Sequence, residues 1–155
     1  MAMTMPYCLL NPAPTEVERL SRQRDGEGQA ALVIGAGMAG MEAARLARLR
    51  VFAVTVWERS PGPGGQVALI KEMPARATFW KAVEFYRREL AAEGVVIEYG
   101  REATEEAIRA FAPDAIIVAT GSRPDMPAWA QSTNGVTANT RVLDIREALA
   151  RGPGA

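Results

Sequence analysis

The chain has 155 residues, of which 18 are Lys or Arg and 18 are Asp or Glu, so its formal charge at neutral pH is zero. A chain of this length can bury one hydrophobic core, and a neutral chain has no positive field to attract nucleic acid or an anionic membrane. It has no histidine, the most common general base and metal ligand, and its single cysteine cannot form an internal disulfide. We therefore expect one cytoplasmic domain, without metal or catalytic residues, whose chemistry comes from a cofactor.

The first predicted strand and helix follow an N-terminal segment that has no clear secondary-structure pattern. Residues 1–28 contain three prolines, many charges and little apolar periodicity, so we interpret them as an extended leader or linker. A short apolar run predicts a buried strand over residues 31–34, and a helical pattern begins directly after it, near Met38. The residues of this helix that can face a sheet are Met38, Met41, Ala44, Leu46 and Ala47.

The second strand is expected over residues 53–58, where "AVTVWE" is rich in β-branched residues. Val51 and Phe52 stand between the helix and this strand, in place of a glycine-containing turn. Because helices commonly end on a left-handed residue, and glycine adopts that conformation most easily, we expect local strain or a shifted helix boundary here.

The second half of the chain continues the alternation. "TFWKAVEFYRRELAAEG" has the spacing of an amphipathic helix and ends on Gly94, a suitable C-cap. Its apolar stripe, which we expect in the core, consists of Phe79, Trp80, Val83, Tyr86 and Leu90. A strand over 95–99, a short helix with Thr104 as its N-cap, and a strand over 114–121 follow. A turn-rich stretch then leads to a helix capped by Asp144.

Strands that alternate with helices predict a parallel sheet covered on both faces. We expect a Rossmann-like, doubly wound α/β domain over residues 29–150, with residues 151–155 as a tail. The carboxyl ends of parallel strands meet at one edge, where ligands bind in such folds. Three glycine-bearing segments, "GAGMAG", "PGPGGQ" and "ATG", each follow a predicted strand. This coincidence is the main support for a binding function.

Gly35, Gly37 and Gly40 match the dinucleotide-binding pattern G-x-G-x-x-G. The first glycine permits the turn, the second lets the backbone approach a pyrophosphate, and the third lets the helix pack closely on the strand. The N-terminus of that helix would direct its free N–H groups at the phosphates. The alternative is a tight turn that binds nothing, and this reading is stronger for "PGPGGQ" and "ATG" taken singly.

Glu58 ends the second strand at about the separation, roughly 20 residues, that the dinucleotide pattern requires. Its carboxylate would accept hydrogen bonds from ribose hydroxyls and repel a 2′-phosphate, which favours FAD, NAD or ADP over NADP. Arg59, next to it, keeps NADP open as an alternative.

The segments "VIGAGMAGMEAARLA", "VTVWERSPGPGGQ" and "IIVATGSRP" together resemble the flavin-binding domain of flavoprotein reductases. "CLLNP" and "GGQVALIKEMPARATFWKAVEFYRREL" resemble, more narrowly, the NADH:flavin oxidoreductase and 2,4-dienoyl-CoA reductase group, which includes trimethylamine and histamine dehydrogenases. In that group a TIM barrel with FMN and a four-iron four-sulfur cluster precede this kind of domain, and a nicotinamide-binding domain follows it. The resemblance implies a fragment in which Cys8 occupies the place of the fourth cluster ligand.

The resemblance also implies a set of site residues. They are Gly35, Gly37, Met38, Ala39 and Gly40 for the pyrophosphate, Glu58 and Arg59 for the adenosine ribose, Gly65 and Gln66 for the ribityl chain, Ala103 for adenine, and Ala119, Thr120 and Gly121 alongside the phosphates. Met38 stands where proline is usual. In an intact parent, electrons would pass from a nicotinamide to FAD and through the cluster to FMN. For this chain alone we expect binding of an adenine dinucleotide without turnover, with FAD as the first candidate and ADP or NAD as other possibilities. The alternatives are a non-catalytic ADP-holding module, or a docking subunit of a barrel-bearing partner.

Overall fold

The computed structural model describes residues 23–71, 73, 75–131 and 142–151. It divides the chain into two compact units, Met1–Gly121 and Ser122–Ala155. The predicted leader up to residue 22, with Cys8, and the residues after 151 lie outside the described residues. The first unit contains all the predicted site residues.

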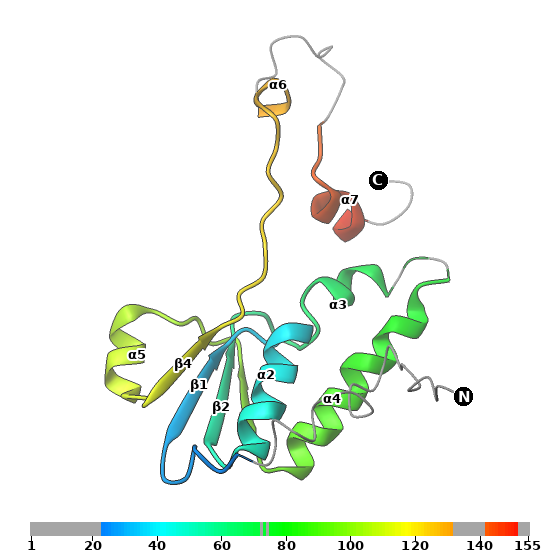
Figure 1. Cartoon of the computed structure of the whole chain (residues 1–155). Coiled ribbons are helices and arrows are strands. Elements are labelled where there is room, and N and C mark those ends of the chain that lie inside the picture. The colour runs from blue at the N-terminus through cyan, green and yellow to red at the C-terminus, as the bar shows by residue number, and fades with distance from the viewer. Residues whose placement is uncertain (1–22, 72, 74, 132–141, 152–155) are drawn as a thin grey trace, which may run out of the picture. The chain divides into compact units, whose positions relative to one another are not determined.

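A parallel sheet in the order β3-β2-β1-β4 forms the centre of the first unit (Figure 1). Its strands are β1 (Ala30–Ile34), β2 (Ala53–Glu58), β3 (Val96–Tyr99) and β4 (Ala115–Val118). The chain runs outward from β1 to β3 and then crosses back to β4 on the other side of β1, so the direction of winding reverses beside β1. The predicted Rossmann-like α/β fold is confirmed, and all strands end at the same edge because all are parallel.

Helices cover both faces of this sheet (Figure 1). On one face, α2 (Met38–Leu49) lies beside α4 (Trp80–Ala92), and α5 (Glu105–Phe111) lies on the other. A short helix, α3 (Gln66–Ile70), and a 3₁₀ turn, η1 (Ala77–Phe79), precede α4. The sequence did not predict α3, because one and a half helical turns are too short to show a hydrophobic period.

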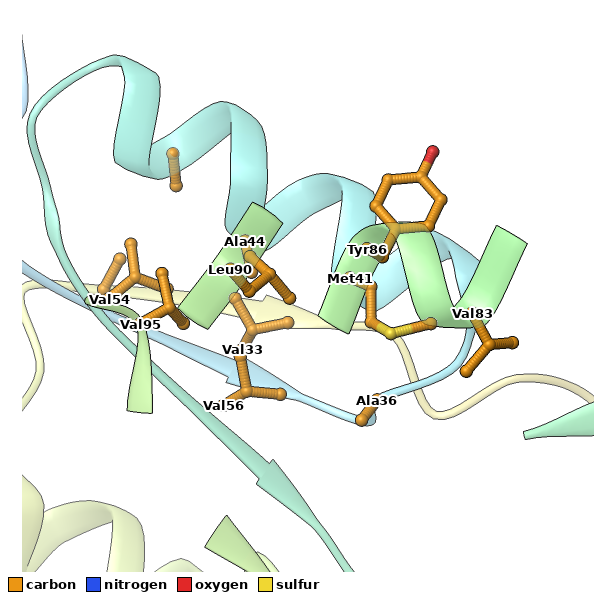
Figure 2. Close-up of a cluster of buried hydrophobic side chains, with 12 residues drawn as sticks. Val33, Ala36, Met41, Ala44, Val54, Val56, Val83, Tyr86, Leu90 and Val95 are labelled. Carbon is orange, nitrogen blue, oxygen red and sulfur yellow. The ribbon is translucent and has the colours of Figure 1, made fainter. Parts of the chain in front are cut away.

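The core lies between the sheet and the helices α2 and α4 (Figure 2). Val33 of β1 and Val56 of β2 are fully buried, in one cluster with Met41 of α2 and Leu90 of α4. The other buried members are Ala31, Ala36, Ala44, Ala47, Val54, Val83, Tyr86 and Val95. Burying a side chain of this size contributes about 1.5–3 kcal/mol. This layer therefore fixes α2 and α4 on the sheet, largely through the residues that their helical spacing predicted.

Two aromatic residues expected in the core, Phe79 and Trp80, differ in burial. Phe79 is 41% exposed, so its predicted burial is wrong. It lies in η1, where three residues make one turn, so the 3.6-residue period of α4 does not extend to it. Trp80 is half-buried and packs against the core.

Helix α2 ends on a valine in the left-handed conformation. The N–H of Val51 donates to the carbonyl of Arg48 (2.9 Å), and the N–H of Phe52 donates to the carbonyl of Ala47 (3.1 Å). This pair of bonds is the Schellman motif, which places the residue after the C-cap at positive φ. Val51 has φ 66°, a conformation that crowds a β-branched side chain. The strain predicted at this position is confirmed.

Helix α4 ends in the same motif, with glycine at the corresponding position. The N–H groups of Gly94 and Val95 donate to the carbonyls of Ala91 (3.1 Å) and Leu90 (2.9 Å), and Gly94 has φ 71°. Gly94 is thus the C-terminal glycine that the sequence predicted. The left-handed residue is a valine, with a Cβ, at the end of α2, and a glycine, without one, at the end of α4.

Exchanging valine and glycine at these two positions tests whether Val51 is strained. We predict that Val51→Gly raises the free energy of unfolding by about 1 kcal/mol, because relief of the left-handed strain exceeds the added freedom of the unfolded chain. Gly94→Val should lower it by about 1–2 kcal/mol. The urea midpoint at an unchanged m-value measures both effects. A destabilised Val51→Gly protein would show that Val51 is not strained.

A polar network joins α2 to α4 at the border of the core. Arg45 is only 6% exposed, and its Nε and Nη2 donate to the two carboxylate oxygens of Glu42 at 2.7 and 2.9 Å. Tyr86 of α4 is buried beside this pair. Its burial raises the pKa of Tyr86 to about 12, and the charge of Glu42 and a hydrogen bond to it add to that increase.

The raised pKa makes the stability of the fold depend on pH in the alkaline range. The folded state prefers the protonated phenol, so this contribution is complete below the unfolded-state pKa of about 10. It is lost as the pH rises from there to about 12. We predict that Tyr86→Phe loses less stability than the wild type as the pH rises from about 10 to about 12. Urea unfolding of both proteins at these two pH values measures the loss. An equal loss in both proteins would assign the effect to another group.

The described residues of the second unit include two short helices, α6 (Ala128–Gln131) and α7 (Ile145–Arg151). Asp144 Oδ1 accepts hydrogen bonds from the N–H groups of Arg146 (2.7 Å) and Glu147 (2.9 Å). The Glu147 carboxylate accepts one in return from the Asp144 N–H (3.1 Å), which completes a capping box. The predicted helix capped by Asp144 is confirmed.

Candidate functional site

The first glycine loop connects β1 to α2 with no room for side chains at two positions. A Cβ on Gly35 would lie 2.5 Å from the carbonyl oxygen of Ala119, and one on Gly40 would lie 1.9 Å from the carbonyl oxygen of Gly35. Gly35 also has φ 108°, which a residue with a side chain rarely adopts. These two glycines therefore let the end of β4 and the first turn of α2 approach the end of β1.

Gly37 is a glycine for a different reason. Its φ of −75° suits any residue, and a Cβ built on it would meet no heavy atom within 4 Å beyond its chain neighbours. Neither the backbone conformation nor packing within the described fold requires glycine here. The missing Cβ leaves open space beside the loop, which is what close approach of a ligand to the backbone requires.

That open space adjoins the N-terminus of α2. Gly37 is the N-cap, no side chain caps this end, and no acidic residue stands in the first turn. The first-turn residues Met38 and Ala39 thus carry backbone N–H groups at the positive end of a 12-residue helix. An anionic group such as a phosphate fits such a terminus.

The carboxylate of Glu58 holds the glycine loop from the end of β2. Glu58 is 8% exposed; its Oε2 accepts the N–H of Ala36 at 2.7 Å, and its Oε1 accepts the N–H of Ser60 at 2.8 Å. A carboxylate has about four acceptor positions, so two remain for another donor. The sequence predicted that Glu58 lies at this edge, but not that it is buried and bound to the loop. Arg59 is exposed next to it.

The second glycine loop packs against the first. The N–H of Gly64 donates to the carbonyl of Ala36 at 2.8 Å, and Gly64 is buried at φ 104° against the Trp80 side chain. A Cβ on Gly65, at φ 51°, would lie 3.3 Å from the Cα of Gly37. The two loops are therefore in contact at the open space beside Gly37. Gln66 begins α3 and is exposed.

Ala36 and Gly64 help to build the site although neither is among the site residues predicted from the sequence; Gly64 lies in the predicted glycine segment after β2. Ala36 bonds to Glu58 through its N–H and to Gly64 through its carbonyl. Repeated glycine in "PGPGG" was the available signal for Gly64. Ala36 gave no signal, because it acts through backbone groups that every residue except proline has.

The segment after β3 lies against the end of β2. The N–H of Gly100 donates to the carbonyl of Ser60 and the N–H of Arg101 donates to the carbonyl of Glu58, both at 3.0 Å. Ala103 follows two residues later and is half-buried, directly before Thr104. Thr104 caps α5 as predicted, because its hydroxyl accepts the N–H of Ala107 at 3.2 Å.

Aromatic and charged side chains line the junction of β2 and β3. Tyr99 is paired with Glu58 in the sheet register. Burial raises the pKa of Tyr99, and the charge of Glu58 raises it further against the opposing effect of Arg87. On the opposite face Trp57 is buried, and the guanidinium carbon of Arg101 lies 3.8 Å from its ring centroid.

The segment after β4 completes the edge. The N–H of Ala119 donates to the carbonyl of Ile34 at 2.8 Å, which holds it beside the first glycine loop. Thr120 and Gly121 are exposed, and Gly121 has φ 77° with open space around its Cα. The structure thus brings the predicted site residues to one edge of the sheet, at the carboxyl ends of its strands.

The two kinds of glycine in the first loop should respond differently to alanine. We predict that Gly40→Ala lowers the free energy of unfolding by about 2–3 kcal/mol, because its Cβ would overlap a backbone oxygen. Gly37→Ala should lower it by less than about 1 kcal/mol, since only the N-cap preference changes. Urea unfolding of both variants measures the difference. Equal losses would mean that the fold itself requires glycine at 37.

Comparison with known proteins identifies this architecture. Residues 29–154 match the family model described as pyridine nucleotide-disulphide oxidoreductase. The chain belongs to this family. The resemblance to the flavin-binding domain of flavoprotein reductases is thereby confirmed, and with it the nucleotide-binding, Rossmann-type character of the domain.

The relatives in this family include dehydrogenases and reductases. The chain is 36% identical to N,N-dimethylglycine/sarcosine dehydrogenase of Chromohalobacter salexigens over 68% of the chain and 16% of that protein. It is also 36% identical to a metal reductase of Desulforamulus reducens, over 77% of the chain and 19% of that protein. The chain thus spans less than a fifth of the length of these curated relatives.

Solved structures of the same kind superpose on the chain. A 2-naphthoyl-CoA reductase has a TM-score of 0.63 and 37% identity, covering 64% of this chain and 15% of its own. Histamine dehydrogenase from Rhizobium sp. 4-9 has a TM-score of 0.60 and 29% identity, covering 63% of this chain and 15% of its own. The group that the sequence resembles is therefore represented among its structural relatives.

The described residues contain neither a cluster of metal-binding side chains nor a membrane-spanning helix. In that part of the chain, no three His, Cys, Asp or Glu side chains are placed to hold a metal ion. None of the described helices has the length and apolarity needed to cross a membrane.

Proposed function

We propose that this domain binds FAD, with the adenosine diphosphate half of the cofactor at the sheet edge described above. The observation that carries the proposal is the open space at Gly37, beside an uncapped helix N-terminus. The first-turn N–H groups of α2 would hold the pyrophosphate. The two acceptor positions that remain on Glu58 would take the ribose hydroxyls, with Arg59 on the rim.

The remaining assignments follow the family pattern and the position of each segment at this edge. Gly65 and Gln66 would lie toward the ribityl chain, the backbone of Ala103 toward adenine, and Ala119 to Gly121 alongside the phosphates. A bound flavin would supply the hydride and electron-transfer chemistry. The described residues would bind and orient it, and no side chain of theirs has an evident role as acid, base or nucleophile.

For the longer proteins to which this chain corresponds, we propose NAD(P)H-dependent electron transfer. A nicotinamide would reduce FAD, and electrons would continue through a four-iron four-sulfur cluster, with Cys8 as one ligand, to FMN in a TIM barrel. Relatives named as NADH oxidase and bilirubin reductase support this oxidoreductase assignment. Residues 29–150 would be the cytoplasmic nucleotide-binding domain, with 1–28 as linker and 151–155 as tail.

One observation favours a role in docking alongside cofactor binding. Ile116 and Val118 of β4 are 48% and 70% exposed. Side chains alternate along a strand, so both lie on the face opposite the core that Ala115 and Ile117 contact. Soluble monomers seldom leave large apolar patches uncovered. This supports the alternative in which a further domain or a barrel-bearing subunit covers this face.

The first test is retention of flavin. We predict that the chain incubated with excess FAD keeps a flavin spectrum after gel filtration, and that ADP displaces it better than NAD. Gly37→Ala should weaken binding of both FAD and ADP by about tenfold, because its Cβ would occupy the space that the pyrophosphate needs. Glu105→Gln, on the exposed surface of α5, is the control.

The possible outcomes separate the alternatives. A colourless protein that still binds ADP would favour the ADP-holding module over a FAD site. Loss of both ligands, or a Gly37→Ala protein that binds as well as the wild type, would contradict the proposed site. Steady NADH oxidation by the purified chain would contradict binding without turnover.

A further inference from the structure

We propose that Glu58 is a positioning residue for the phosphate-binding loop, and that its main contribution to nucleotide affinity passes through the N–H of Ala36. This inference rests on the proposed nucleotide site. It differs from the ribose contact that the family pattern implies, because it assigns the carboxylate a function before any ligand arrives.

The geometry at the end of β2 supports this function. Both carboxylate oxygens of Glu58 already accept short hydrogen bonds from backbone N–H groups, those of Ala36 (2.7 Å) and Ser60 (2.8 Å). The backbone carbonyl of Glu58 accepts the N–H of Arg101 as well. One residue therefore ties together the segments that follow β1, β2 and β3.

Glu58 acts on the proposed phosphate site through Ala36. Ala36 is fully buried, and it directly precedes Gly37, the N-cap of α2. Its N–H is held by Glu58, and its carbonyl is held by Gly64. The orientation of the peptide before the phosphate-binding turn is thus fixed from both sides. Without Glu58, the buried N–H of Ala36 would lose its partner, which is unfavourable for the observed loop conformation.

The charge of Glu58 and its hydrogen bonds to the loop have opposite effects on ADP affinity. A carboxylate near a diphosphate repels it, so removing the charge alone should tighten ADP binding. Removing the acceptor that orders the loop should weaken ADP binding. Glutamine is isosteric with glutamate, but it offers one acceptor and one donor, so it cannot accept both N–H groups. Aspartate keeps the charge and is shorter by one methylene, so it cannot span both donors.

The first experiment compares ADP with 2′,3′-dideoxy-ADP, which lacks the ribose hydroxyls, by calorimetric titration of the full chain. We expect Glu58→Gln to weaken both ligands by about tenfold or more, with any additional loss for ADP, from its ribose contact, smaller than this shared loss. Glu58→Asp should weaken both as well, and Glu105→Gln should change neither. A loss confined to ADP, or tighter binding of both ligands by Glu58→Gln, would overturn the inference.

The second experiment needs no ligand. Amide hydrogen exchange of the free protein should be faster at Ala36 and Ser60 in Glu58→Gln than in the wild type, while Val33 in the core of β1 reports that the fold is intact. Unchanged exchange at Ala36 would overturn the inference. If the wild type binds neither nucleotide, the proposed function fails, and the exchange measurement still decides the role of Glu58.

Discussion

The close approach of backbone segments at the end of β1 is the constraint on which the rest of the domain depends. Gly40 lets the first turn of α2 lie against the carbonyl of Gly35, and Gly35 lets the end of β4 approach the end of β1. Helix α2 can therefore start immediately after its strand and lie along the sheet. Its apolar side then meets α4 over Val33 and Val56, and its N-terminus stays at the edge where the strands end.

This arrangement separates stability from binding. The apolar layer lies between the sheet and α2 and α4, whereas the site is built from backbone groups, glycines and one buried carboxylate at the strand ends. Backbone donors fixed by tertiary hydrogen bonds lose little freedom when a ligand binds, and preorganisation of this kind favours affinity. Such a domain binds and orients a flavin, and the redox chemistry belongs to the cofactor.

The fold also retains features that its core does not explain. Val51 occupies a left-handed position that glycine occupies at the equivalent end of α4. Ile116 and Val118 expose apolar surface on β4, and the curated relatives extend far beyond the length of this chain. Covering that face with further polypeptide would extend the same two-sided layering that α2, α4 and α5 provide for the central strands.

The sequence by itself determined the strands, the longer helices, several caps and the family, because hydrophobic periods, capping residues and glycine spacing are local patterns. It also predicted strain at Val51, since the missing glycine is a local signal. Only the tertiary structure showed that Phe79 is exposed, that Ala36 joins two loops, and that Glu58 is buried against backbone donors. These features depend on contacts between segments distant in sequence. Every residue except proline has a backbone N–H, so the residue type does not show which N–H groups form such contacts.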